Sequence, residues 1–78
     1  MRIGVIGLGN IGGAIAGNLV ADGHDVIVHD TDATRVTAIA GASAATTVGR
    51  VAEAADITLL SLPTPAIVDE VAKTWAEA

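Results

Sequence analysis

The sequence predicts an α/β domain built on a partial, doubly wound parallel sheet of about four strands, in the order βαβαβαβα. Two observations support this prediction. Short runs of β-branched and aliphatic residues alternate with segments whose apolar residues recur at helical spacing. The connections between these segments are short, which is typical of parallel strands joined by right-handed helical crossovers. A chain of 78 residues forms one domain at most, so residues 1–78 are interpreted as a single unit with a thin core.

The first three predicted elements are the clearest. Residues 2–7 read R-I-G-V-I-G, which is typical of a short buried strand. From residue 11 to residue 22 the apolar residues recur at helical spacing, which predicts a helix. This helix stops at Gly23, because glycine readily adopts the left-handed conformation that ends many helices. A second apolar run at 26–28 predicts a strand that ends at His29 and Asp30. The helix has apolar residues four apart, which predict one buried face: Ile11, Ile15 and Leu19.

The second half of the chain continues the same alternation. Thr31 or Asp32 is suited to begin a short helix, and Thr47 to begin another, because their side chains can accept hydrogen bonds from the first turn. In order, the predicted elements are a helix that carries Val36, Ile39 and Ala40 and ends at Gly41, a weak strand at 42–47, a helix from Thr47 to Ala55, a strand at 56–62 broken by Pro63 and Pro65, and an amphipathic helix that uses Ile67, Val68, Val71, Ala72 and Trp75.

Composition excludes several classes of function. The chain is 51% hydrophobic and 17% charged, which is too apolar for a disordered protein. Four basic residues against nine acidic ones leave no electrostatic footprint for nucleic acid or an anionic membrane, so we expect neither as a partner. Without Cys, and with two isolated His, no disulfide, thiolate nucleophile or metal site is expected. The cytoplasm is the default location for such a chain.

The segment from Gly7 to Gly12 matches the pattern G-x-G-x-x-G, directly after a strand and at the start of a helix, within a βαβ unit of about 30 residues. Gly7 permits the tight turn, Gly9 leaves room for a pyrophosphate beside the backbone, and Gly12 lets the helix lie close to the strand. Free N–H groups at the positive end of the helix dipole would attract the phosphates without any basic side chain. The predicted cofactor-binding residues of this loop are Gly7, Leu8, Gly9, Asn10, Ile11 and Gly12.

An acidic residue at the end of the second strand predicts which dinucleotide binds. Asp30 lies 18 positions after Gly12, where a carboxylate can accept hydrogen bonds from the ribose hydroxyls of NAD and would repel the 2′-phosphate of NADP. NAD is therefore preferred over NADP, although Arg35, a helical turn and more away from Asp30, could partly counter the repulsion. The fourth strand ends at Ser61–Thr64, where we expect Leu62 and Pro63 to line the nicotinamide-side ribose.

These residues resemble the amino-terminal signature of the β-hydroxyacid dehydrogenases, the relatives of 3-hydroxyisobutyrate and 6-phosphogluconate dehydrogenase. The resemblance covers nearly the whole chain, although Ile11 and Ile15 stand where the family usually has Met. It implies a Rossmann domain whose cofactor positions correspond to the glycine loop, Asp30 and Leu62-Pro63, followed by a mostly helical domain. The segments that carry it are V-I-G-L-G-N-I-G at 5–12, Ala16, Asn18-Leu19, Gly23-His24, and the stretch from Ala55-Asp56-Ile57 to Leu62-Pro63.

The resemblance also implies that the family's catalytic Lys, and the Ser and Asn that bind substrate, lie in later segments that this sequence does not contain. We therefore expect no catalytic residue here, and an NAD(P)-binding portion of a hydride-transferring oxidoreductase that is inactive alone. The missing helical domain, or a second subunit, would cover the open edge of the sheet. The only Lys, Lys73, is interpreted as a solvated surface residue, and His29 as an ordinary residue at a strand end.

Three alternatives stay open at this point. A non-enzymatic NAD(H)-binding sensor or regulatory module would use the same loop. An S-adenosyl cofactor or FAD is a lesser possibility, and FAD would need further binding regions. Residues 3–21 are almost uncharged and contain Gly9, Gly13 and Gly17 at four-residue spacing, so they could instead form a signal peptide or a membrane helix.

Overall fold

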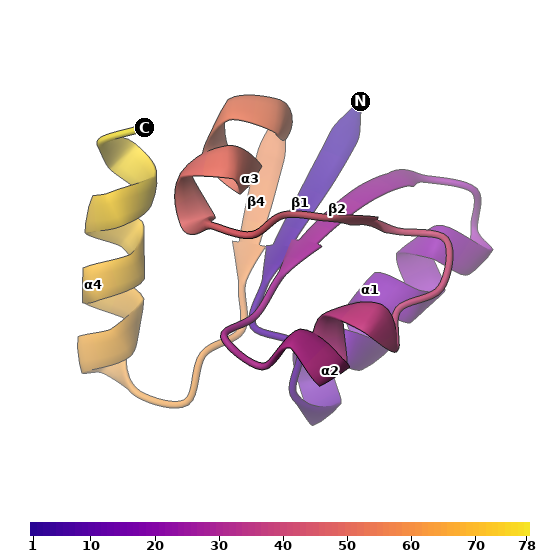
Figure 1. Ribbon diagram of the computed structural model, residues 1–78, viewed down its shortest axis with the longest axis horizontal. Coiled ribbons are helices and arrows are strands. Elements are labelled where there is room, and N and C mark those ends of the chain that lie inside the picture. The colour runs from indigo at the N-terminus through magenta and orange to yellow at the C-terminus, as the bar shows by residue number, and fades with distance from the viewer.

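A computed structural model describes all residues, 1–78, and confirms the predicted fold class. Four strands form one parallel sheet in the order β3-β2-β1-β4, with β1 between β2 and β4 (Figure 1). The elements along the chain are β1 (Arg2–Ile6), α1 (Asn10–Ala21), β2 (Asp25–His29), α2 (Ala33–Thr37), β3 (Ser43–Ala44), α3 (Val48–Ala54), β4 (Ile57–Leu60) and α4 (Pro65–Ala76).

The sheet separates two apolar layers. Because successive side chains of a strand point to opposite faces, adjacent Val5 and Ile6 of β1 are both buried, one in each layer. The layer beneath α1 and α2 contains Val5, Leu8, Ala16, Val26 and Val28. The layer beneath α3 and α4 contains Ile6, Ile27, Ala45 and Val51. Because the strands are parallel, the carboxyl ends of β1, β2 and β4 lie together at one edge of the sheet.

The predicted buried face of α1 is wrong for Ile11 and Ile15, although Leu19 packs against the core as predicted. Ile11 is 71% exposed and Ile15 is exposed too, whereas Gly12 and Ala16 are buried and Leu19 is half-buried. The reason is the close approach of α1 to β1: a Cβ at Gly12 would overlap the carbonyl oxygen of Gly7. Only small residues fit such a contact, so the larger isoleucines are turned away from it.

Three elements are shorter than predicted. Helix α2 ends at Thr37, before Ile39 and Ala40, and a turn through Gly41, at φ +86°, brings the chain to β3. Ile39 still packs against the core from that turn. Strand β3 has two residues instead of six, and β4 ends at Leu60 instead of residue 62. One further bond, from the Ser61 N–H to the Ile6 carbonyl (2.9 Å), extends the β4 ladder before the chain leaves the sheet at Pro63.

The predicted caps are confirmed. The side chains of Asp32 and Thr47 accept hydrogen bonds from the first turns of α2 and α3, at 3.0 and 3.2 Å. Helix α4 begins in the same way at Thr64, with Pro65 in its first turn. It is held to the sheet by the indole N–H of Trp75, which donates to the Thr58 hydroxyl at 3.1 Å.

The membrane interpretation of residues 3–21 is wrong, because this stretch forms β1, a tight turn and α1. No helix of the structure combines the length and the apolar character that a membrane span requires. Of the three glycines that suggested a helix–helix contact, only Gly13 has backbone close by, since an added Cβ would lie 3.1 Å from the Leu8 carbonyl oxygen; Gly9 and Gly17 have open space beside them.

Candidate functional site

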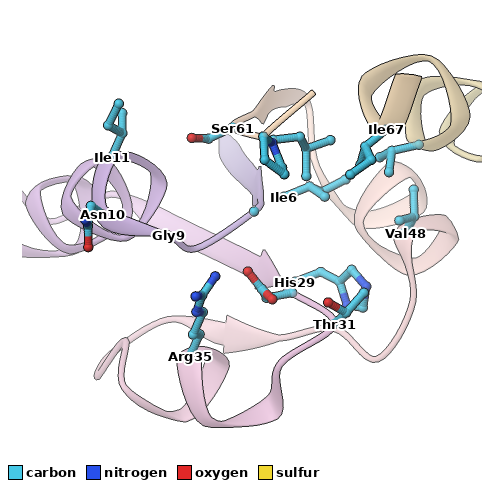
Figure 2. A pocket seen from close by; sticks show the side chains of 15 residues that line it. Ile6, Gly9, Asn10, Ile11, His29, Thr31, Arg35, Val48, Ser61 and Ile67 are labelled. Carbon is cyan, nitrogen blue, oxygen red and sulfur yellow. The ribbon is translucent and has the colours of Figure 1, made fainter. Parts of the chain in front are cut away.

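A cavity of about 530 Å³ opens at the carboxyl ends of β1, β2 and β4 (Figure 2). This is the edge at which open parallel sheets bind ligands, next to the position where the strand order reverses. Seven of the nine predicted site residues line it: Gly7, Gly9, Asn10, Ile11, Asp30, Leu62 and Pro63. The other two lie behind its wall, where Leu8 is buried in the core and Gly12 is packed against β1.

Two of the three motif glycines are required by the fold itself. Gly7 has φ +94°, a left-handed conformation that favours glycine, and a Cβ there would overlap the carbonyl oxygen of Ser61. A Cβ at Gly12 would overlap the Gly7 carbonyl and lie 2.9 Å from the Ser61 Cβ. Both residues therefore close the turn between β1 and α1 and bring the end of β4 against it.

Gly9 is different, because nothing in the protein requires a glycine there. Its φ is −68°, which any residue adopts, and the nearest atom to an added Cβ would be Arg35 Nη1, at an ordinary 3.9 Å. The missing side chain leaves open space beside the first turn of α1, on the wall of the cavity. That space is the room a ligand would need to approach the backbone.

The first turn of α1 is free to bind an anion. No side chain caps it, no acidic residue lies in it, and the N–H groups of Asn10 and Ile11 have no hydrogen-bond partner. The first intrahelical bond runs from the Gly13 N–H to the Gly9 carbonyl, at 2.8 Å. Unpaired N–H groups at the positive end of a helix dipole favour phosphate.

Asp30 is fixed by hydrogen bonds from two loops. One carboxylate oxygen accepts from the Leu8 N–H at 2.7 Å and the other from the Asp32 N–H at 2.8 Å. Partial burial raises the pKa of Asp30, but the hydrogen bonds from Asp32 and Leu8, with the charges of Arg35 and His29, outweigh it and hold the pKa below its ordinary value. The carboxylate is therefore ionised at neutral pH.

Arg35 lies closer to the site than the sequence suggested. It lines the cavity and reaches from α2 towards Gly9, while its Nε lies 3.8 Å from Asp32 (Figure 2). Sequence reasoning placed it a turn and more away from Asp30, because the turn that brings α2 back over the glycine loop could not be read from spacing alone.

Several other residues of the cavity were missed. They are His29 and Thr31 at the end of β2, and apolar side chains from three other elements: Ile6, Val48, Ile67 and Val71. The apolar spacing of α3 and α4 marks these side chains as core-facing, and it gives no sign that the core is open at this end. Lys73 is exposed on α4 and does not line the cavity. No group of three His, Asp or Glu side chains is placed so that it could hold a metal ion.

Fold and site together define a nucleotide-binding α/β domain of the doubly wound type. Residues 2–77 match the family model described as the NAD binding domain of 6-phosphogluconate dehydrogenase, and the chain belongs to this family. This confirms the resemblance inferred from the sequence.

One relative and two solved structures of similar fold show how the chain compares with longer proteins. A probable mitochondrial 3-hydroxyisobutyrate dehydrogenase from Dictyostelium discoideum is 39% identical in a 71-residue alignment, and the match covers 88% of this chain and 22% of that protein. Two imine reductase structures from Myxococcus stipitatus share the fold at 24% and 23% identity, with TM-scores of 0.88 and 0.89. One of them, a variant, is in complex with NAD⁺ and the other with NADP⁺, and the matches cover 92% and 94% of this chain and 25% and 26% of theirs. The chain therefore spans about a quarter of the length of these relatives.

Proposed function

We propose that this chain is the nicotinamide-dinucleotide-binding portion of an oxidoreductase that transfers a hydride between its cofactor and a small hydroxyacid. The observation that carries the proposal is Gly9, whose missing Cβ leaves space that the protein does not use. Family membership and the position of the cavity at the carboxyl ends of the strands support it. When bound, the nicotinamide ring would donate or accept the hydride, and the residues described here would hold the cofactor in place.

Each predicted site residue has a distinct role in this proposal. The free N–H groups of Asn10 and Ile11 bind the pyrophosphate, which lies in the space beside Gly9. Asp30 accepts hydrogen bonds from the adenosine ribose hydroxyls, since each of its oxygens has further acceptor capacity beyond its backbone bond. Leu62 and Pro63, at the end of β4, line the ribose on the nicotinamide side.

Asp30 favours NAD over NADP. Its lowered pKa keeps a negative charge where the 2′-phosphate of NADP would lie, and the two charges repel each other. Arg35 supplies the opposing charge, but its side chain is more than half exposed and its Nε already lies near Asp32, so solvent and the carboxylate weaken its attraction for a phosphate. The preference for NAD is therefore moderate in size.

Residues 1–78 form the dinucleotide domain in this proposal, and the substrate-binding and catalytic groups lie in another domain or subunit. Ile57 and Leu59 of β4, which pairs only with β1, are 49% and 40% exposed, and α1 leaves Ile11 and Ile15 exposed as well. An apolar surface beside an unpaired strand edge is what a further domain or subunit would cover. We expect the cytoplasm as the location; the relative from Dictyostelium is described as mitochondrial, so the comparison does not support that expectation.

Replacing Gly9 tests the proposal directly. Gly9→Val fills the space for the pyrophosphate, and we expect NAD binding in titration calorimetry to be lost. The protein itself should stay folded, because a Cβ there meets only the flexible end of Arg35. Gly17→Ala on the exposed side of the same helix is the matched control, since an added Cβ meets nothing within 4 Å, and it should bind NAD like the unchanged chain. A folded Gly9→Val protein with unchanged NAD affinity would refute the assignment of the loop.

A further inference from the structure

His29 occupies a defined position at the end of β2. It pairs with Ile6 in the register of the sheet, so the two side chains point to the same face, towards α3 and α4. Asp30, the next residue, turns its carboxylate the other way, to the glycine loop. The two side chains therefore lie on either side of the strand end, and both line the cavity.

The protonation pattern of the His29 ring follows from one hydrogen bond. Its Nδ1 lies 2.8 Å from the carbonyl oxygen of Ala45, which follows β3. A carbonyl oxygen can only accept, so Nδ1 carries the hydrogen, and in the neutral ring Nε2 must then be an acceptor. No protein group bonds to Nε2, and no side-chain nitrogen or oxygen is both buried and without a partner, so Nε2 is accessible to solvent. An accessible acceptor with fixed orientation therefore lies on the cavity wall.

The surroundings of the ring suit a flat aromatic ligand. On the same face of the sheet, the cavity is lined by the aliphatic side chains of Val48 from α3 and Ile67 from α4 (Figure 2). Val71 from α4 and Leu62 after β4 complete this apolar lining. None of these four offers a hydrogen bond, so His29 and the nearby Thr31 hydroxyl supply the polar contacts there. Apolar walls with few, well-placed polar groups are typical of sites that bind heterocycles.

We propose that His29 reads the adenine base of the cofactor, with Nε2 accepting a hydrogen bond from the exocyclic 6-amino group. The inference rests on the proposed function, because a ribose held at Asp30 is what places its base across the strand end at His29. This contact would discriminate between bases of the dinucleotide, which the glycine loop and Asp30 do not, since they contact phosphates and sugar only. A 6-oxopurine such as hypoxanthine presents an oxygen acceptor in place of the amino donor, and two acceptors facing each other cannot form a hydrogen bond.

The test compares NAD with nicotinamide hypoxanthine dinucleotide, which differs only at the base. By titration calorimetry the unchanged chain should bind NAD roughly tenfold more tightly, the effect expected of one good hydrogen bond replaced by an acceptor pair. In His29→Leu, NAD should weaken to the level of the hypoxanthine analogue, so that the ratio approaches one. Both ligands are measured on the same variant, so a change in stability cancels from the ratio.

A second variant separates a specific contact from general packing. In His29→Gln, the amide offers both an oxygen acceptor and an N–H donor, so both dinucleotides should bind about as tightly as NAD binds the unchanged chain. Equal affinities for the two ligands in the unchanged chain, or a ratio that survives His29→Leu, would overturn the inference and leave the proposed function intact. Failure of the unchanged chain to bind either dinucleotide would overturn the proposed function itself.

Discussion

Gly12 offers the sharpest test of how this fold brings its site together. A Cβ at Gly12 would overlap the Gly7 carbonyl oxygen and lie 2.9 Å from the Ser61 Cβ and 3.0 Å from the Gly7 carbonyl carbon. Ordinary contacts between carbon atoms are about 3.5–4.0 Å, so in Gly12→Ala helix α1 must move away from β1 by roughly 1 Å. Two of these three atoms belong to the Gly7 backbone and the third, the Ser61 Cβ, is bonded directly to backbone, so none of them can rotate aside as the end of a side chain can.

The magnitude follows from two opposing effects. Overpacking of this kind costs about 1–3 kcal/mol, and contact with backbone places Gly12→Ala near the upper end. The higher helix propensity of Ala returns about 1 kcal/mol at most. We therefore expect a net loss of about 2 kcal/mol in the free energy of unfolding, which in a domain of this size lowers the thermal midpoint by roughly 8–16 °C. Circular dichroism during heating measures this directly.

Gly17→Ala provides the control from the same helix. An added Cβ at Gly17 meets nothing within 4 Å, so only the propensity effect remains and the midpoint should rise by about 4–8 °C. A Gly12→Ala protein as stable as the unchanged chain would refute the close approach of α1 to β1. It would also remove the explanation for the exposed Ile11 and Ile15.

Other expected outcomes concern Asp30 and the chemistry. In Asp30→Ala the ratio of NAD to NADP affinity should fall, and a ratio that does not move in parallel titrations would exclude Asp30 as the ribose ligand. The folded pKa of Asp30 lies below its ordinary value, so the carboxylate's contribution to stability is complete above the unfolded pKa and is lost as the pH falls through the folded pKa. Urea midpoints measured from pH 6 downward should therefore fall less steeply in Asp30→Asn, and an identical slope would contradict the pKa shift. The 78-residue chain should show no dehydrogenase turnover with small hydroxyacids; measurable NADH production would place catalytic groups within it.

The sequence predicted the glycine loop well because its constraints are local. A strand, a turn at Gly7 and a helix follow one another within a dozen residues, and the glycine at the turn directly indicates its left-handed backbone conformation. The side of α1 that is buried could not be predicted by the same reasoning. Apolar spacing marks Ile11 and Ile15 as core residues, whereas contact distance to β1 selects Gly12 and Ala16. Size complementarity across an interface is a tertiary property that periodicity does not carry.

Contacts between residues that are far apart in the sequence explain the remaining differences between the predicted and the observed site. Arg35 reaches the glycine loop, and His29 is oriented by Ala45, through turns whose path depends on the packed sheet. The strand β3 is likewise a matter of tertiary pairing, since only Ser43 and Ala44 pair with β2. The spacing of residues along the sequence therefore could not indicate that Arg35 and His29 line the site.

The hydrogen bond between Asp30 and the Leu8 N–H affects the entropy cost of binding a ligand. It joins the end of β2 to the glycine loop, and together with the bond from Asp32 it fixes the carboxylate before any sugar arrives. The conformational entropy of ordering that side chain is thus already lost on folding, and little of it remains to be lost on association. Such preorganisation predicts a receptor that changes shape very little between its empty and loaded forms at this end of the sheet.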